Sequence, residues 1–148
     1  MNRLLISPRH LQTIGRHAAM TSPEECCGVL IGRSMHETTL VERVLSVGNA
    51  SPGDRQERYR RYQIPPETVL AAHKEARALG LEVVGYYHSH PDGPARPSEA
   101  DRENAWPGVS YLIVSVKGRQ VVETRSWRLG DMGFEEEEID QAALRIAV

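Results

Sequence analysis

The chain has 148 residues, of which 40% are hydrophobic and 26% are charged, with a formal net charge of -2 and a pI near 6.3. This length and composition predict one globular domain over residues 1–148, with a core large enough to need no disulfide bonds. The nearly balanced charge argues against a nucleic-acid or membrane-surface partner, and no apolar run approaches the roughly 20 residues that span a bilayer.

The N-terminal segment predicts a short strand followed by a helix. Residues 3–6 are mostly apolar, and Ser7 followed by Pro8 is typical of a helix start, with serine as the N-cap. Four apolar residues at helical spacing would face inward: Leu11, Ile14, Ala18 and Ala19. The helix should end before the sequence TSPEE, because the residue before a proline avoids helical backbone angles.

Two strands and a polar segment follow. Residues 26–32 (CCGVLIG) are typical of a buried strand that ends at glycine, and residues 38–47 are rich in the β-branched residues that favour strands. Residues 48–63 form the most polar stretch of the chain. They predict either a mobile loop or a loop that faces a substrate, and we interpret their arginines as solvated surface.

The second half of the chain alternates helices and strands. The predicted elements are a helix over residues 65–79 that Gly80 caps, a strand over 81–87, a short helix over 98–105, and strands over 109–116 and 121–129. The glutamate run at residues 135–138 predicts an exposed edge or C-terminal face. The pattern as a whole predicts one α/β domain with a mixed, largely antiparallel sheet.

The adjacent cysteines, Cys26 and Cys27, are poorly placed to bridge each other, so we expect free thiols in a reducing, cytoplasmic compartment. The first ten residues lack the apolar segment of a secretory signal. We interpret Cys27 as a small buried core residue, with a reactive thiol as the alternative.

The segment HSHPDGPARPSEAD, residues 88–101, contains a candidate metal site. His88 and His90 are two residues apart on extended backbone, so their side chains point the same way. Asp101 stands in the first turn of the helix that Ser98 opens, and residues three apart share a helix face. Two imidazoles and one carboxylate suit Zn²⁺, and three protein ligands leave a position open for water, as in catalytic sites.

Hydrolysis at such a site also needs a base that takes a proton from water. The candidates are Glu25 and Glu24, which stand just before the predicted strand 26–32, and spacing alone does not choose between them. Ser98 is either the N-cap of its helix or a donor to an oxyanion, and one residue can do both.

These residues together resemble the signature of the JAMM/MPN-plus zinc metalloproteases. The shared pattern is His88-Ser-His90-Pro91, six residues, Ser98, two residues and Asp101. The upstream PEECCG resembles that family's glutamate three residues before a glycine. The resemblance therefore selects Glu25 as the base.

The resemblance implies a cytidine-deaminase-like fold in which helices flank the sheet. It further implies one zinc ion held by His88, His90 and Asp101, with Glu25 as general base and Ser98 steadying the oxyanion. The short chain is most similar to the prokaryotic branch. That branch implies hydrolysis after the Gly-Gly tail of a ubiquitin-like or sulfur-carrier protein, which could add as a strand to a free sheet edge. The sequence does not determine the oligomeric state of this chain.

Two alternatives come from other classes of protein. A non-catalytic interaction module of the same fold would lack the ligands, whereas this chain has all of them and the base. A cysteine hydrolase would use Cys26 or Cys27 with a histidine, and its sensitivity to thiol alkylation rather than to a chelator would reveal it. Trp106 is expected to pack against the domain rather than to wall a cleft.

Overall fold

The computed structural model describes residues 2–141, which form an α+β fold. Its helices are α1 (Pro8–Thr21), α2 (Pro66–Ala78) and α3 (Glu99–Asn104), with a 3-10 turn at Glu57–Tyr59. Its strands are β1 (Arg3–Leu5), β2 (Cys27–Met35), β3 (Thr38–Val47), β4 (Glu82–Pro91), β5 (Ser110–Lys117), β6 (Gln120–Gly130) and β7 (Gly133–Asp140). In this range no helix is long and apolar enough to cross a membrane.

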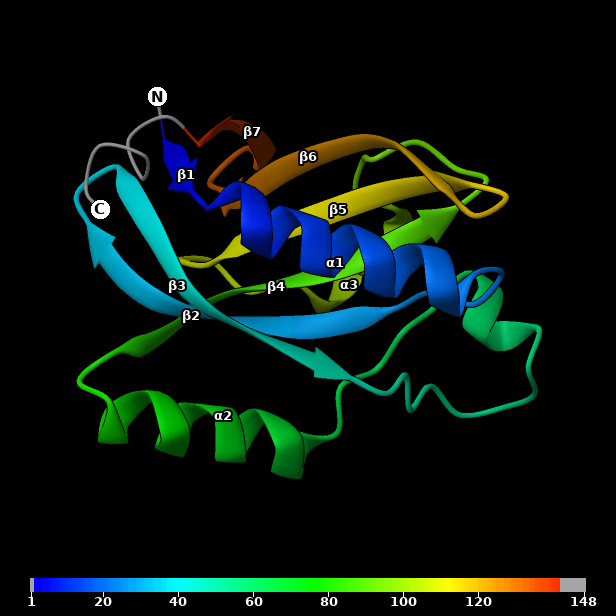
Figure 1. The fold of residues 1–148 in the computed structure, drawn as a ribbon, viewed down its shortest axis with the longest axis horizontal. Coiled ribbons are helices and arrows are strands. Elements are labelled where there is room, and N and C mark those ends of the chain that lie inside the picture. Colours follow the sequence, from blue (N-terminus) through cyan, green and yellow to red (C-terminus); the bar gives the residue numbers. More distant parts are fainter. Residues whose placement is uncertain (1, 142–148) are drawn as a thin grey trace.

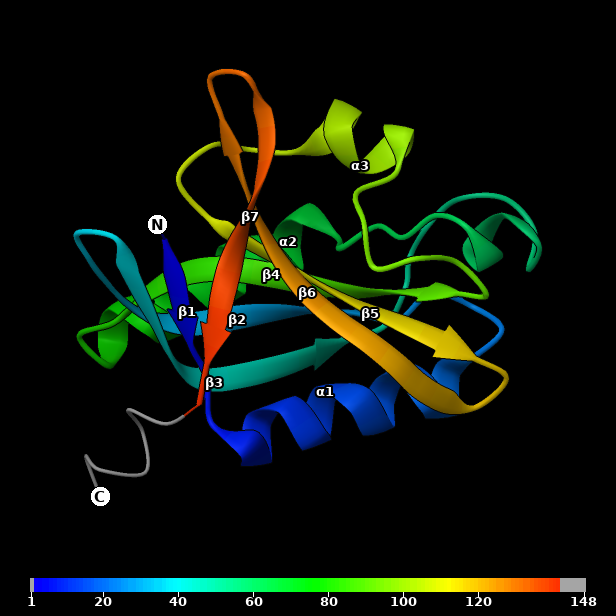
Figure 2. The same cartoon turned by 90° about the horizontal axis from the view of Figure 1, so that it is seen from above.

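The strands form one mixed sheet in the order β1-β3-β2-β4-β5-β6-β7, which closes because β1 also pairs with β7 (Figure 2). The pairs β2–β3, β2–β4, β5–β6 and β6–β7 are antiparallel, and the pairs β1–β3, β1–β7 and β4–β5 are parallel. The expected mixed, largely antiparallel sheet is confirmed. The relation to cytidine deaminases stays a prediction.

The glutamate run is exposed at Glu135, Glu136 and Glu138, as expected for a surface face, but it does not form an edge of the sheet. Residues 135–138 lie in β7, which is bonded on one side to β6 and on the other to β1. Because side chains alternate between the two faces of a strand, Glu137 turns inward and is only 2% exposed. Its carboxylate accepts a hydrogen bond from the Ser126 hydroxyl at 2.6 Å, which partly offsets the cost of burying the charge.

Closure of the sheet also corrects the expected mode of substrate binding. The strand that carries the histidines, β4, lies between β2 and β5 and is hydrogen-bonded to both. At His88 the described strands therefore offer no free edge on which an extended peptide could add as a further strand, since the pairing with β2 reaches His88 and the pairing with β5 continues to Pro91.

Helices α1 and α2 lie on opposite sides of the central strands (Figure 1). Leu30 of β2 belongs to the core cluster that packs beneath α1, whereas its neighbours Val29 and Ile31 pack toward α2. Both faces of β2 are therefore covered, which explains why residues 26–32 are a continuous apolar run instead of an alternating one.

Local signals explain the ends of the two long helices. The Ser7 side chain accepts a hydrogen bond from the His10 amide at 3.1 Å, and Ile14 and Ala18 are the buried residues of α1. At the other long helix, α2 ends at Ala78 and Gly80 follows with a φ of +71°, a conformation that glycine adopts without a steric penalty. These predicted boundaries are confirmed to within a few residues.

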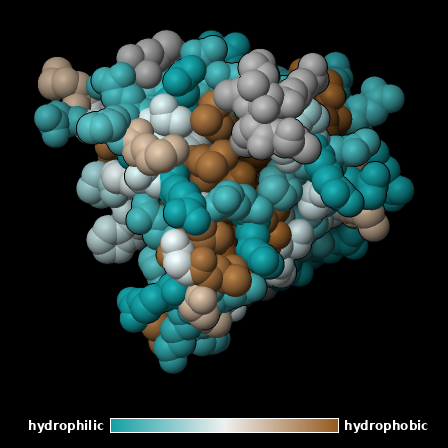
Figure 3. Space-filling view, turned by 60° about the vertical axis from the view of Figure 1, so that its left-hand side comes forward, coloured by the Kyte–Doolittle hydropathy of each residue, from teal (hydrophilic) through white to brown (hydrophobic). Residues whose placement is uncertain are grey.

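The surface of the domain mixes polar and apolar side chains. On the face shown in Figure 3, hydrophobic residues gather in patches that polar residues interrupt. Large apolar side chains such as Met20 and Met132 are exposed, at 78% and 95%. Single exposed apolar residues of this kind are normal on a globular protein and indicate no particular partner.

Candidate metal centre and catalytic site

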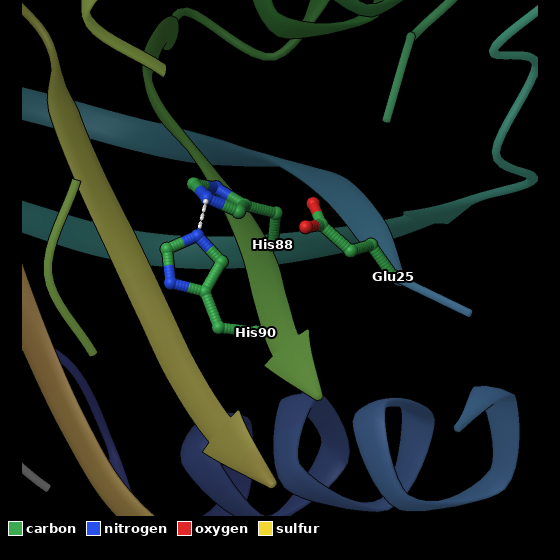
Figure 4. Close-up of side chains that lie close together, drawn as sticks. All are labelled: Glu25, His88 and His90. Atoms are coloured by element: carbon green, nitrogen blue, oxygen red, sulfur yellow. Dashed lines mark hydrogen bonds between the residues drawn. The ribbon is translucent and has the colours of Figure 1, made fainter. Parts of the chain in front are cut away.

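His88 and His90 lie within β4, where they project from the same face of the strand (Figure 4). The predicted strand ended at residue 87, but β4 continues to Pro91 because β5 pairs with it in parallel as far as Val116. His88 is fully buried and His90 is 8% exposed, and their Nε2 atoms are 3.0 Å apart. Ser89 points to the other face, where its hydroxyl accepts a hydrogen bond from the Cys26 amide.

Asp101 completes a compact triangle of ligand-type atoms. Its Oδ2 atom is 3.0 Å from His88 Nε2 and 3.1 Å from His90 Nε2. Bonds of about 2.0–2.1 Å in a tetrahedral zinc site separate neighbouring ligand atoms by roughly 3.3 Å. The three atoms therefore already have nearly the spacing that one tetrahedral ion requires.

A hydrogen bond outside the triangle defines the proton on His90. Its Nδ1 atom is 2.8 Å from the carbonyl oxygen of Pro94, so Nδ1 carries a hydrogen and donates it. In the neutral imidazole this leaves a lone pair on Nε2, aimed at the carboxylate of Asp101. Two lone-pair atoms at 3.1 Å are favourable only with a cation or an added proton between them. The donor set therefore fits a metal ion.

The electrostatics of Asp101 and His88 agree with this interpretation. Burial alone would raise the pKa of Asp101, but its contacts with His88, His90 and the Ser98 amide outweigh burial and lower that pKa. Burial lowers the pKa of His88 despite the opposing charge of Asp101. The site thus contains a firmly ionised carboxylate beside a neutral imidazole, the protonation states in which both groups bind metals. At His90 burial alone would lower the pKa, but the contacts with Asp101 and the Pro94 carbonyl and the charges of Asp101 and Glu25 outweigh burial and raise it, which favours a positive charge at this position.

The N-cap of α3 connects Ser98 directly to Asp101. Asp101 N donates to the Ser98 hydroxyl oxygen at 3.1 Å, and Ser98 N donates to Asp101 Oδ2 at 2.8 Å, which is a capping box. The carboxylate oxygen that faces the histidines is therefore the one that the backbone orients. Within residues 2–141, no acceptor takes the hydroxyl hydrogen of Ser98.

Glu25 lies just before β2 and is only 4% exposed. Its carboxylate points toward His88 (Figure 4), and one oxygen of Glu25 and one nitrogen of each histidine lie within 4.8 Å of one another. Its Oε1 atom is buried without a hydrogen-bond partner. Burial raises the pKa of Glu25 to about 8, although His90 acts in the opposite direction. An unpartnered buried carboxyl beside a metal-type cluster is an unusual feature with a functional explanation.

Glu24 faces away from this cluster. Its carboxylate pairs with Arg58 at 2.5 Å and with Arg55 at 3.8 Å, and a quarter of the side chain is exposed. Of the two glutamates that the residue pattern alone could not separate, Glu25 is therefore the one that reaches the histidines.

The motif glycine also has a structural role. A Cβ atom on Gly28 would lie about 2.0 Å from the ring of Tyr87, so a side chain at this position would collide with the core. Glycine here leaves room for the Tyr87 ring of the neighbouring strand β4.

Neither cysteine has the properties of a nucleophile. Cys26 and Cys27 are buried, and burial raises the pKa of each thiol to about 12. A reactive cysteine needs the opposite shift, toward a thiolate at neutral pH. The structure therefore supports the interpretation of Cys27 as a core residue and gives no support to a cysteine hydrolase.

A cleft of about 520 Å³ opens beside Asp101. Residues of the polar segment 48–63 line one side of it, including Arg60, Arg61 and Tyr62, so this segment faces the cleft. Trp106 also lines the cleft and is 70% exposed, so the expectation that it packs against the domain is wrong. Its backbone, rather than its ring, is anchored, because the Trp106 amide donates to the Tyr111 hydroxyl at 2.7 Å.

Tyr62 is a site residue that the residue patterns did not predict. Its ring stacks on the imidazole of His88, with centroids 4.5 Å apart and planes 22° apart. It stands 26 positions before His88 within a polar segment, where nothing in its spacing relates it to the histidines. Only the tertiary structure, in which residues 48–63 fold over β4, places Tyr62 beside His88.

The comparisons with known proteins agree with this geometry. A family described as prokaryotic homologs of the JAB domain matches residues 7–130. A desampylase of Haloferax volcanii is 39% identical over 103 residues, covering 69% of this chain and 70% of that protein. A probable TtuB-protein conjugate cleaving protease of Thermus thermophilus is 34% identical over 116 residues, covering 78% and 72%. A solution structure of a Desulfitobacterium hafniense protein superimposes with a TM-score of 0.79 at 33% identity, covering 95% and 92%.

Proposed function

The chain belongs to the family of prokaryotic homologs of the JAB domain, and from this premise we propose that it is a zinc metallopeptidase. Its proposed substrate is a ubiquitin-like or sulfur-carrier protein, cleaved immediately after a Gly-Gly tail. Two relatives support this substrate class, since one is a probable TtuB-protein conjugate cleaving protease and another is a desampylase.

The proposed ligands of the zinc ion are His88, His90 and Asp101, with one ion per chain. The single observation that carries the proposal is the triangle of their ligand atoms, 3.0–3.1 Å on each side. When bound, zinc would act as a Lewis acid toward water and toward the scissile carbonyl.

Glu25 is the proposed general base, which takes a proton from water and then passes it to the leaving amine. Its carboxylate faces the histidines, has a free oxygen, and has a pKa raised by burial to about 8. A base whose pKa lies near the working pH combines an ionised form with a useful tendency to accept the proton.

Ser98 is proposed to steady the oxyanion of the tetrahedral intermediate while it also caps α3. The two roles are compatible, because the cap uses the hydroxyl oxygen as an acceptor and leaves the hydroxyl hydrogen to donate. Donors to an oxyanion are typically worth about 10²–10³ in rate.

The tail of the substrate is proposed to lie in the cleft that ends at Asp101, in place of adding to a sheet edge. Glycine at the two positions before the scissile bond would let the extended backbone approach the cleft wall closely, where a Cβ atom would collide. The two buried free thiols further support action in a reducing, cytoplasmic compartment.

The proposal is tested with two fusions of one small ubiquitin-like protein to a short peptide, joined through Gly-Gly or through Ala-Ala. Intact mass after incubation should show cleavage directly after Gly-Gly, much slower cleavage after Ala-Ala, and none with a chelator. Equal rates on both fusions would indicate a general peptidase. Cleavage that resists the chelator would contradict the proposed zinc chemistry. No cleavage of any carrier despite bound zinc would favour the interaction module.

A further inference from the structure

The two histidines of the proposed metal site differ in how their rings are oriented. Histidine ligands ordinarily donate their second ring nitrogen to a carbonyl, carboxylate or water, which fixes the plane of the imidazole. His90 has such a partner, since its Nδ1 atom is 2.8 Å from the Pro94 oxygen. The Nδ1 atom of His88 is buried and has no hydrogen-bond partner.

Tyr62 lies where its ring can restrict the orientation of the His88 imidazole by stacking, without a hydrogen bond. The two rings are nearly parallel, at 22°, with centroids 4.5 Å apart. Rotation of the imidazole about its Cβ–Cγ bond would drive the ring edge into the phenol ring. A stacked aromatic neighbour therefore restricts the same torsion that a hydrogen bond at Nδ1 would restrict.

Tyr62 is itself held in place through its two chain neighbours. The side-chain nitrogen of Asn49 donates to the Arg61 carbonyl at 2.8 Å, and the Gln63 amide donates to the side-chain oxygen of Asn49 at 3.2 Å. The Ala50 amide also donates to the Gln63 carbonyl at 2.9 Å. The backbone on either side of Tyr62 is thus fixed to one asparagine, so the phenol ring is a firm surface for His88.

We propose that Tyr62 is a positioning residue that orients the His88 imidazole toward the metal by stacking on it, in place of the missing hydrogen bond. This inference rests on the metal site of the proposed function. The ring is the part that acts, and the hydroxyl is not needed. Because Tyr62 also lines the cleft, the same ring separates His88 from whatever occupies that space.

The inference predicts different effects for two substitutions at the same position. Tyr62→Leu removes the ring, and should weaken zinc affinity about 10-fold, the low end of the loss seen when an outer partner of a metal ligand is removed. Tyr62→Phe keeps the ring and should bind zinc within about twofold of the unchanged protein. Zinc affinity is measured by competition with a chromogenic chelator, and the visible spectrum of the Co²⁺-substituted protein reports the coordination geometry.

Tyr59→Leu is the matched control, because Tyr59 belongs to the same segment but is exposed and makes no ring contact with the histidines. Circular dichroism of the metal-free proteins checks that each variant folds. If Tyr62→Leu does not fold, Tyr62→Met provides a flexible side chain without a ring, and the same 10-fold loss is expected.

The outcomes separate this inference from the metal site itself. If the unchanged protein binds no stoichiometric zinc, or if His88→Ala binds it equally well, the metal site and the role of Tyr62 fail together. Suppose instead that the unchanged protein binds zinc and His88→Ala does not. If Tyr62→Leu or Tyr62→Met then matches Tyr59→Leu in zinc affinity and in Co²⁺ spectrum, only the role of Tyr62 is overturned. A loss in Tyr62→Phe as large as in Tyr62→Leu would also overturn it, because the hydroxyl would then be responsible.

Discussion

The side-chain nitrogen of Asn49 donates a hydrogen bond to the main-chain oxygen of Glu25 at 3.0 Å. The same nitrogen donates to the Arg61 carbonyl, and the Glu25 amide in turn donates to the Arg58 carbonyl at 2.7 Å. Asn49 thereby connects the main chain of Glu25, the proposed base, to the polar segment that lines the cleft. This segment is therefore not a detached loop but part of the structure that positions Glu25.

Asn49→Asp should destabilise the protein and slow hydrolysis. The substitution keeps the acceptor oxygen but replaces the donor to two carbonyl groups by a carboxylate oxygen, which repels them. Leaving a buried carbonyl group unsatisfied costs about 1–3 kcal/mol, and of the two bonds the one to Glu25 is partly buried and the one to Arg61 is exposed. The free energy of unfolding should therefore fall by about 1–3 kcal/mol in urea denaturation.

Asn104→Asp is the matched control for stability, because the Asn104 side chain donates a single exposed hydrogen bond within α3. Its free energy of unfolding should change by less than about 1 kcal/mol. Equal losses in the two variants would show that the bonds of Asn49 to the site contribute nothing special.

Glu25→Gln should keep the metal and lose most of the hydrolysis. The amide has the size of the carboxylate but cannot accept a proton, and removal of a general base typically costs about 10²–10⁴-fold in rate. Glu24→Gln should be almost silent, because Glu24 makes partly exposed ion pairs with Arg55 and Arg58. The readouts are kcat/KM and zinc content. The assignment of the base is wrong if Glu24→Gln is the crippled variant.

Ser98→Ala should reduce turnover more than it reduces stability. Loss of the N-cap costs about 1 kcal/mol, whereas loss of an oxyanion donor costs about 10²–10³ in kcat. Thermal denaturation and initial rates on the Gly-Gly fusion measure the two effects separately. An unchanged kcat with a lowered Tm would show that Ser98 only caps α3.

The metal-free protein should lose stability as the pH rises, and Glu25 should cause part of that loss. Burial raises the pKa of Glu25 in the folded protein to about 8, above its ordinary value of 4.5. Because the pKa of Glu25 is higher in the folded than in the unfolded protein, the contribution of Glu25 to the free energy of unfolding is complete below about pH 4.5. This contribution is lost as the pH rises through about 8, where the buried carboxyl must ionise.

The test is urea denaturation of the chelator-treated protein and of Glu25→Gln between pH 4.5 and 8.5. Glutamine does not ionise, so the free energy of unfolding of the variant should exceed that of the unchanged protein by a margin that grows with pH. A difference that stays constant over this range would contradict a raised pKa at Glu25.

The sequence alone was sufficient wherever geometry follows from short-range periodicity. The two-residue spacing of His88 and His90 puts both imidazoles on one face of any extended strand, and the three-residue spacing of Ser98 and Asp101 puts them in one capping box of any helix that starts there. The N-cap at Ser7 is equally local, and it was predicted for the same reason.

Long-range pairing was decided only by the tertiary structure. The choice between Glu24 and Glu25, made from the sequence only through a family resemblance, depends physically on the register that sets Cys27 opposite His88. The course of residues 48–63, which brings Tyr62 over His88, has no local signal at all.

Closure of the sheet has the same physical origin. Leu4 of β1 pairs with Ile139 of β7 across most of the chain, and no local pattern in either segment encodes such a partner. An edge at the glutamate run and a free edge for the substrate tail were therefore both compatible with the sequence, whereas β7 pairs with a strand on each side. Local periodicity determined which side chains share a face of one element. The pairing of distant elements, which depends on packing the whole core at once, decided which faces meet.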